Sequence, residues 1–388
     1  MMKLIRFLLV LLFFSASLLA QDKAFYQKKK IWGKEKTILT GDFSKIKKPT
    51  LNDFKQVFHF PPIRQDTTGT CWCFSTTSFL ESDLFRRTGR KIKLSEMYTV
   101  YWEYVEKARR YVQQKGDSEF GQGSESNAVL NRIRQYGCMP RSVYTGLING
   151  RTKYNHDPMF KEMYDYLKFL KKNNYWDEDV ALTTIKAILN KYMGKPPATF
   201  PYKGKTYTPE EFRDQVCQIN PDDYVGFMST LKTPFYQQGE YEAPDNWWHS
   251  KDYYNVPLDV FYKTIKNTIK HGQSLVIGGD VSEPGKYGWE DIAIIVPWDL
   301  PQKSINQYSR EFRIYNHTTT DDHGIHLVGY THKYGHDWFL IKDSGSSSHY
   351  GKFKGYYFFR DDFVKLKMLT FMVHKDMVKD LLKKFKKG

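Results

Sequence analysis

The hydrophobic pattern of this chain changes its period close to residue 273, and this change limits the folds that the chain can adopt. Before that point apolar residues recur at helical spacing, and the helical spans are 72–88, 95–105, 126–136, 160–170 and 178–192. After it, short strand-like runs occur at 274–278, 311–315, 324–330, 338–342 and 355–359. We therefore expect an α+β fold, in which a helical half precedes an antiparallel sheet or partial barrel, with a functional cleft between the halves.

The same pattern divides the chain into five segments. We expect a signal peptide over 1–20, an N-terminal arm over 21–53, a helical lobe over 54–150, a helical insertion over 151–260, and a β lobe with a basic C-terminal tail over 261–388.

The first twenty residues have the order of a secretory signal peptide. Lys3 and Arg6 precede the apolar run 7–14, and small residues lead to a cleavage position near Ala20. The run is short for a membrane span, and no other stretch is apolar enough to cross a bilayer. We expect the mature protein to be exported, to the periplasm or the medium, with no membrane contact beyond the signal peptide.

The formal net charge is +16, which invites a nucleic-acid interpretation. The excess is spread along the chain in lysine pairs and accompanies no nucleic-acid-binding motif, so we expect a solvated basic surface and no nucleic-acid partner. His332 and His336 form an isolated pair on a turn between strands, and no cysteine or histidine spacing is typical of a metal site. We expect neither a metal nor a cofactor.

The stretch from Gln65 to Ser75 reads as a loop followed by the first turn of an apolar helix, with Cys71 at the junction. The helix dipole and the free N–H groups of the first turn favour the thiolate form of a cysteine placed there. Gln65, six residues earlier, could direct its amide at a developing oxyanion. A lone cysteine at a helix start is more often a small core residue, so this interpretation depends on partners elsewhere in the chain.

A histidine and an aspartate near strand ends are the candidate partners. His323 stands at the head of the apolar strand 324–330, and Asp343 follows the strand 338–342. His323 could act as base, and Asp343 could accept a hydrogen bond from its ring. His326, three residues further along the strand, should face the other side, with a role in the core or on that second face.

These residues stand in motifs that resemble the papain-type cysteine peptidases, and among them the bleomycin hydrolase and aminopeptidase C branch. The resemblance covers about 54–375 and is carried by Gln65, by Gly69-Thr70-Cys71-Trp72 and by the run 320–326. It implies a papain-like two-lobed fold that hydrolyses peptide bonds without a cofactor. It assigns Cys71 as nucleophile, His323 as base and acid, Asp343 as the group that orients it, and Gln65 with the Cys71 N–H as the oxyanion hole.

The resemblance also implies how substrate binds. Gly123 and Ser124 fall where the family's glycines pair with the substrate backbone, and Trp72 borders the nucleophile. In this branch the C-terminal tail lies in the cleft and restricts cleavage to chain ends. Aminopeptidase activity on peptide or protein substrates is therefore favoured over endopeptidase activity, and the basic tail 383–388 would be the restricting segment. Assembly into a homo-oligomer is a further trait that the resemblance implies.

Two departures leave an alternative open. Asp343 occupies the family's asparagine position, and Gly345 occupies the position of a tryptophan that shields the histidine. A catalytically weakened papain-like protein that binds peptides is therefore the second interpretation. With Cys71 as the working thiol, at least one of the other three cysteines, Cys73, Cys138 and Cys217, stays unpaired.

Overall fold

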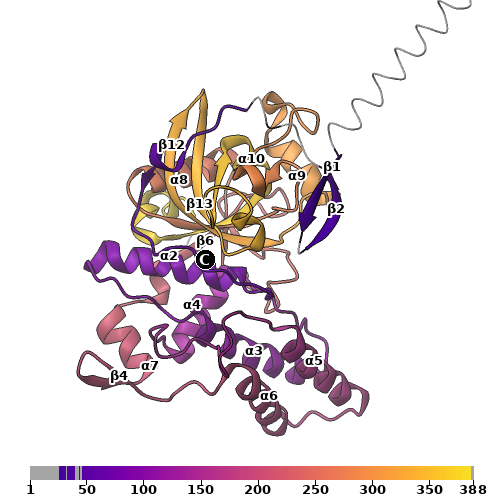
Figure 1. Ribbon diagram of the computed structural model, residues 1–388, viewed down its shortest axis with the longest axis vertical. Helices are drawn as coiled ribbons and strands as arrows, with labels where there is room; N and C mark the ends of the chain where they lie inside the picture. The colour runs from indigo at the N-terminus through magenta and orange to yellow at the C-terminus, as the bar shows by residue number, and fades with distance from the viewer. Residues whose placement is uncertain (1–25, 32, 40–42, 44–45, 386–388) are drawn as a thin grey trace, which may run out of the picture.

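The computed structural model describes residues 26–31, 33–39, 43 and 46–385, and it forms two lobes with helix α2 (Cys71–Thr88) between them (Figure 1). The expected signal peptide, 1–20, lies outside these residues. Among the described helices, none combines the length and apolar character that a bilayer span requires.

The helical lobe begins with three helices whose ends follow local sequence signals: α2, α3 (Glu96–Gln113) and α4 (Ser126–Tyr136). Gly89 ends α2 in the left-handed conformation, with φ of 69°, and its N–H donates to the Phe85 carbonyl. The Ser95 hydroxyl accepts a hydrogen bond from the Tyr98 N–H at 3.1 Å and starts α3. These boundaries agree with the predicted spans to within about two residues, except that α3 continues to Gln113, beyond the predicted span 95–105.

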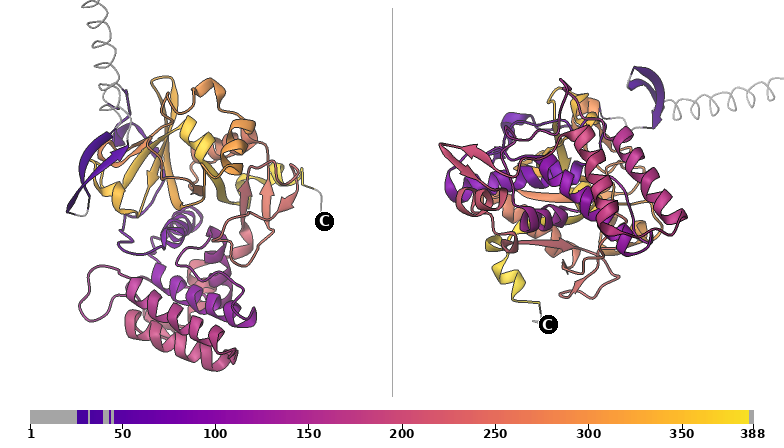
Figure 2. Two further views of the ribbon diagram at one scale, coloured as in Figure 1. Left: turned by 90° about the vertical axis from the view of Figure 1, so that its right-hand side faces the viewer. Right: turned by 90° about the horizontal axis from the view of Figure 1, so that it is seen from below.

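The segment 151–260, expected to be a helical insertion, has its helices at 157–217 and again at its end, where α8 (Leu258–Lys270) begins. It contains α5 (Asp157–Lys172) and α6 (Glu178–Met193), the hairpin β4 (Phe200–Tyr202) and β5 (Lys205–Tyr207), and α7 (Pro209–Glu211), which continues as the π-helical turn Phe212–Cys217. Helices α5 and α6 lie at the end of the molecule farthest from the sheet (Figure 2). Residues 224–255 instead supply strands to the other lobe.

Within the described residues, the β lobe holds an eleven-stranded sheet in the order β10-β11-β14-β13-β12-β9-β15-β6-β8-β7, with β3 (Lys55–Gln56) paired to β12. The pairs are antiparallel except for β11 with β14 and β6 with β8. Its other strands are β6 (Tyr224–Met228), β7 (Gln238–Gly239), β8 (Tyr253–Asn255), β9 (Leu275–Gly279), β10 (Lys286–Tyr287), β11 (Ile292–Ala293), β12 (His323–Lys333), β13 (His336–Lys342), β14 (Tyr356–Arg360) and β15 (Met368–His374).

Helices complete this lobe: α8 (Leu258–Lys270), α9 (Gln307–Tyr315), α10 (Asp361–Lys367) and α11 (Lys379–Leu382). A strand was predicted over 311–315, and that prediction is wrong. The side chain of Asn306 caps α9 by accepting from two backbone N–H groups. The buried Arg310 then anchors the helix by donating to the carbonyls of Ser229 and Lys365. Capping and this tertiary contact outweigh a short alternating pattern.

The N-terminal arm, 21–53, packs on the β lobe in its described part. It forms a hairpin of β1 (Tyr26–Ile31) and β2 (Lys34–Leu39), and the ring of Phe43 stacks on that of Tyr287 with 5.0 Å between centroids. All four cysteines are free thiols, although the sulfurs of Cys138 and Cys217 lie 3.8 Å apart.

Helix α2 packs against both α4 and β12 and so joins the lobes. Gly324 permits this close approach, because a Cβ atom there would lie 3.3 Å from the Trp72 Cα. Further along α2, the Ser78 hydroxyl hydrogen-bonds Nδ1 of His326 at 2.8 Å and accepts from the Lys342 ammonium at 2.7 Å. His326 is fully buried, so of its two expected roles the structure shows the one in the core.

Asp83 of α2 joins the lobes through a second buried network. Its carboxylate accepts hydrogen bonds from the hydroxyl of Tyr224 in β6 at 2.7 Å and from the side-chain amide of Gln273 at 3.1 Å, while Arg86 and Arg87 supply positive charge. Burial acts to raise the pKa of Asp83, but the hydrogen bond from Arg87 and the charge of Arg86 outweigh it and lower that pKa.

Replacing Asp83 by asparagine should destabilise the protein, because two arginines lose their shared counter-ion. We expect the free energy of unfolding near pH 7 to fall by about 3 kcal/mol, measured as a lower urea midpoint. Since the folded-state pKa is lowered, the stabilisation is complete above the unfolded-state pKa and is lost as the pH falls, so the difference should narrow in acid. The control Asp165→Asn removes an exposed carboxylate and should leave the midpoint unchanged. Equal midpoints for wild type and Asp83→Asn would refute this role.

Candidate active site

Cys71 is the first residue of α2 and is partly exposed at the junction of the lobes. Its N–H has no acceptor within the helix, and the helix dipole favours a thiolate at this position. The loop before it is fixed by hydrogen bonds: the Thr68 hydroxyl donates to the Gln65 carbonyl at 2.9 Å, and the Gly69 N–H donates to Oε1 of Gln122 at 3.0 Å. A nucleophile is thereby presented on a rigid turn.

His323 is the first residue of β12, and its ring joins Cys71 to Asp343. Nε2 lies 2.8 Å from Oδ1 of Asp343, which leaves Nδ1 as the ring nitrogen for the thiol. Burial acts to lower the pKa of His323, but the charges of Asp343 and Cys71 outweigh it and raise that pKa to about 10. The arrangement therefore favours the protonated, imidazolium form of His323.

Asp343 follows β13 and is buried, so its charge needs compensation. Oδ1 accepts a hydrogen bond from the Gly345 N–H at 2.7 Å, and the ammonium of Lys286, itself buried, lies 3.7 Å from Oδ2. Burial acts to raise the pKa of Asp343, but His323 and Lys286 outweigh it and hold that pKa far below its usual range. Asp343 is thus an anion under all ordinary conditions.

Gln65 lies beside this group because the residue after Asp343 holds it there. The Ser344 hydroxyl donates to Oε1 of Gln65 at 2.7 Å, and the Gln65 N–H donates to the Ser344 carbonyl at 3.0 Å. Nε2 of Gln65 donates one hydrogen to the Thr68 carbonyl at 2.7 Å, and a primary amide has a second to offer. The structure therefore brings Cys71, His323, Asp343 and Gln65 together at the junction of the lobes.

The three expected substrate-binding residues lie close to the nucleophile but in different environments. Trp72 is 2% exposed and donates through Nε1 to the Gln122 carbonyl at 3.2 Å. Its ring has no free surface for a substrate and instead fixes the neighbouring loop. The Ser124 hydroxyl is also buried and donates to Glu103 at 2.6 Å. The third residue, Gly123, lies against the Asp245 carboxylate.

Lys286 and Ser344 are functional neighbours that the sequence reasoning missed. Ser344 directly follows Asp343, so its position carried a usable signal. Lys286 is far from Asp343 in sequence and no motif surrounds it, so only the fold shows their contact.

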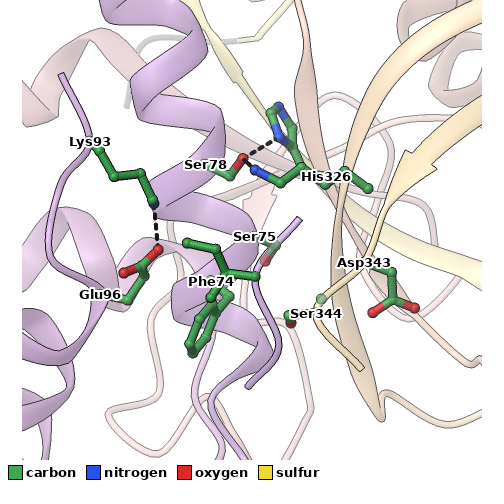
Figure 3. A pocket seen from close by; sticks show the side chains of 11 residues that line it. Phe74, Ser75, Ser78, Lys93, Glu96, His326, Asp343 and Ser344 are labelled. Atoms are coloured by element: carbon green, nitrogen blue, oxygen red, sulfur yellow. Dashed lines mark hydrogen bonds and ion pairs between the residues drawn. The ribbon is translucent and has the colours of Figure 1, made fainter. Parts of the chain in front are cut away.

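Behind the catalytic group a small cavity of 20 Å³ lies between α2 and the β lobe (Figure 3). Figure 3 shows Ser78 facing His326 from α2, and the Lys93 side chain directed at Glu96. Burial first, and then the charge of Lys342, lowers the pKa of His326 well below its usual range, so its ring is neutral. The space behind the nucleophile is a polar core with room for at most one water molecule.

Cys73 is no second nucleophile. Its thiol is completely buried and donates to the Glu96 carbonyl at 3.2 Å, and burial raises its pKa well above the usual value. Within the described part of the chain, no three histidine, cysteine, aspartate or glutamate side chains are grouped in a way that could hold a metal ion.

A cysteine at a helix start, facing a histidine from a sheet across two lobes, defines a papain-like cysteine peptidase. The crystal structure of PepW from Lactobacillus rhamnosis has the same fold, with a TM-score of 0.66 and 18% identity over 87% of this chain and 86% of that one.

The model of the Peptidase C1-like family matches residues 44–387, and the chain belongs to this family. It is similar to aminopeptidase G of Lactobacillus delbrueckii subsp. lactis, with 23% identity over 80% of each chain. It is also similar to aminopeptidase C of Listeria monocytogenes, with 22% identity over 56% of this chain and 58% of the relative. The match to aminopeptidase C thus spans little more than half of that protein.

The charge balance around His323 predicts opposite effects for two substitutions. Asp343→Asn removes the anion that stabilises the imidazolium, so the pKa of His323 should fall and the alkaline limb of Cys71 alkylation should move to lower pH. Lys286→Gln leaves Asp343 uncompensated and should move that limb to higher pH.

The limb is measured as the rate of iodoacetamide labelling of Cys71 between about pH 6 and pH 11. Lys286→Arg keeps the positive charge and is the matched control, with no expected shift. Displacement of the limb in the same direction by Asp343→Asn and Lys286→Gln would contradict the electrostatic account.

Proposed function

We propose that this protein is a cysteine aminopeptidase that hydrolyses peptide bonds through a thioester on Cys71. The observation that carries the proposal is the 2.8 Å hydrogen bond between His323 and the buried Asp343, with the charge of Cys71 acting on the ionisation of His323. Relatives that are named aminopeptidases support the removal of amino-terminal residues over internal cleavage.

The geometry assigns each of these residues a role in the hydrolysis of the peptide bond. The Cys71 thiolate attacks the substrate carbonyl, and the resulting oxyanion accepts hydrogen bonds from the Cys71 N–H and from Gln65 Nε2. Nδ1–H of His323 protonates the leaving amine, so the C–N bond breaks and a thioester remains. His323, now neutral, takes a proton from water, whose oxygen attacks the thioester. Collapse of the second intermediate releases the acid and restores the thiolate and the imidazolium.

Labelling and turnover test this mechanism together. In wild type, iodoacetamide should label Cys71 rapidly near neutral pH, and Cys71→Ala should abolish hydrolysis of aminoacyl aminomethylcoumarin substrates. His323→Ala should slow labelling and lower kcat/KM by about 10²–10⁴-fold, because both the paired cation and the general acid are lost.

Cys73→Ala is the matched control, because that thiol is buried and should leave both readouts unchanged. Slow labelling that is indifferent to His323→Ala would favour the alternative, a papain-like protein that binds peptides without efficient turnover. The motivation for that alternative is Gly345, where a side chain would lie 3.4 Å from the His323 ring and shield it.

We also propose that the chain is exported and cleaved near Ala20. The charged start, the apolar run 7–14 and the small residues before Gln21 support this. Expression of the full chain in a Gram-negative host should give periplasmic protein that begins at or near Gln21, measured by fractionation and N-terminal sequencing. Deletion of 7–14 should retain the protein in the cytoplasm. Wild-type protein that keeps Met1 and stays in the cytoplasm would refute export.

The proposed partners are peptides or proteins as substrates, with no nucleic-acid partner, and a homo-oligomer as the working assembly. The even spread of the basic charge supports the absence of a nucleic-acid partner, and the family resemblance supports the homo-oligomer. Light scattering on the mature protein measures its assembly state directly.

A further inference from the structure

Two buried cysteines from distant parts of the chain face each other in the helical lobe. Cys138 follows the end of α4, and Cys217 is the last residue of the π-helical turn after α7, 79 positions further along the chain. Their sulfurs lie 3.8 Å apart, and the two residues are 4% and 0% exposed. Among the described residues, each sulfur has the other as its hydrogen-bonding partner. We call Cys138 and Cys217 the buried cysteine pair.

The backbone beside Cys138 is in direct contact with the helix that leads to Cys217. The Cys138 N–H donates to the Pro209 carbonyl of α7 at 3.1 Å, and a Cβ atom at Gly137 would lie 2.2 Å from the carbonyl carbon of Pro209. The Arg213 guanidinium then donates to two carbonyls in the last turn of α4, at 3.0 and 2.8 Å. Helices α4 and α7 therefore lie side by side (Figure 1).

The segment around Cys217 is also anchored to α2. Arg87 of α2 donates to the Gln218 carbonyl at 3.0 Å, and Arg90, just after this helix, donates to the Val216 carbonyl at 2.6 Å. Both chain neighbours of Cys217 are thus held in place, and α4 packs against α2 as well. The two sulfurs stay close because the surrounding helices fix the backbone on either side of them.

The distance between the sulfurs is short enough for a covalent bond to form. A disulfide needs an S–S separation of about 2.05 Å, so the sulfurs have to approach each other by about 1.8 Å. Rotation about the Cα–Cβ bonds of the two side chains moves the sulfurs over such a distance. The backbone hydrogen bonds on both sides of the pair can therefore remain.

The other two cysteines have different surroundings. Cys71 occupies the nucleophile position, and the Cys73 thiol donates to the Glu96 carbonyl of α3 at 3.2 Å. Residues two positions apart in a helix do not face each other, so Cys73 is directed away from Cys71. Cys73, Cys138 and Cys217 allow three pairings, and the one whose sulfurs the structure brings together is Cys138 with Cys217.

We propose that the buried cysteine pair forms a disulfide bond in the exported protein and that this bond ties the helical insertion to α4. Disulfides form and persist in the compartments that receive exported proteins, so the inference rests on the proposed export. The closed loop would contain α5, α6, the β4–β5 hairpin and α7. The pairing leaves Cys71 available as the nucleophile.

The reaction is a thiol–disulfide exchange with a donor disulfide such as oxidised glutathione. The thiolate of one cysteine attacks a donor sulfur, forms a mixed disulfide and releases the first donor thiol. The second cysteine attacks this mixed disulfide, forms the bond and releases the second donor thiol. The pair loses two electrons and two protons, which the donor gains. The structure describes the pair in its reduced state, because all four thiols are free.

Burial determines when the bond can form and how it is protected afterwards. In the folded chain, burial raises the pKa of the Cys217 thiol well above its usual value, so little of the nucleophilic thiolate is present. Exchange should therefore take place while the insertion is still folding. Once the lobe has packed, the same burial should shield the bond from reductants.

Thiol counting and peptide mapping test the pairing. The mature protein with Cys71→Ala is refolded in a mixture of reduced and oxidised glutathione, then denatured. One free thiol should remain, Cys73, against three after reduction. Tryptic digestion without reduction should release fragment 135–141 joined to fragment 214–232, lighter than their sum by two hydrogen atoms. Three free thiols, or a linkage that involves Cys73, would overturn the proposal.

Thermal unfolding tests whether the bond stabilises the protein. A cross-link over a long loop lowers the entropy of the unfolded chain, so oxidised Cys71→Ala protein should unfold about 5 °C above the reduced form. Adding Cys138→Ala and Cys217→Ala should abolish this difference. Adding Cys73→Ala is the matched control, because it removes a buried thiol elsewhere and should preserve the difference.

Each comparison is made with and without reductant in one variant, so a cavity left by a substitution affects both measurements alike. Equal midpoints for oxidised and reduced Cys71→Ala protein would overturn the stabilising bond. A reductant effect that persists without the buried cysteine pair would overturn its assignment to these residues.

Trapping in cells separates this inference from the proposed export. The full chain is expressed in a Gram-negative host, its thiols are alkylated before lysis, and the periplasmic and cytoplasmic fractions are mapped separately. The linked fragments should occur in the periplasmic protein. Cytoplasmic protein with free thiols, together with linked fragments after refolding, would refute export and still support the pairing. Periplasmic protein that keeps both thiols free would refute the pairing and leave export standing.

Discussion

The packing of α2 against β12 is the contact on which the rest of the site depends. Cys71 and His323 each stand at the first residue of their element, so their distance is fixed by how closely the helix and the strand approach. Gly324 allows that approach, and Ser78 secures it by bridging to His326 and Lys342 of the sheet. Because interiors are close-packed, a side chain at residue 324 would separate nucleophile and base before it changed either of them.

The aspartate at residue 343 changes the electrostatics of the site more than its geometry. It accepts the same kind of hydrogen bond from His323 that an amide oxygen would accept, but it adds a buried charge. Lys286 offsets that charge from the opposite oxygen, and its ammonium nitrogen lies over the Tyr357 ring, 4.6 Å from the centroid. The His323–Asp343–Lys286 row has alternating signs when the histidine is protonated, which is the state that a thiolate partner requires.

Local sequence signals predicted part of this structure and gave no information about the rest. The cap at Ser95, the stop at Gly89 and the position of His323 at a strand start are encoded within a few residues, and they were predicted correctly. Helix α9 was mistaken for a strand because its anchor, Arg310, bonds to carbonyls far away in the chain. Pairing across the whole sheet determines the strands within 224–255 and the positions of Lys286 and Asp245. The local spacing of apolar residues does not predict such pairing.

The contrast between the overall charge and the local charge bears on how a substrate would be selected. The chain carries a formal net charge of +16, yet the group that faces His323 is the buried carboxylate of Asp343. In physiological salt, exposed charges are screened over about 8–10 Å, so the basic surface cannot cancel a partly buried group in the cleft. A charge on the substrate would therefore be sensed by the site only at short range. Any preference for a charged substrate would act through the lifetime of the bound substrate rather than through its rate of encounter.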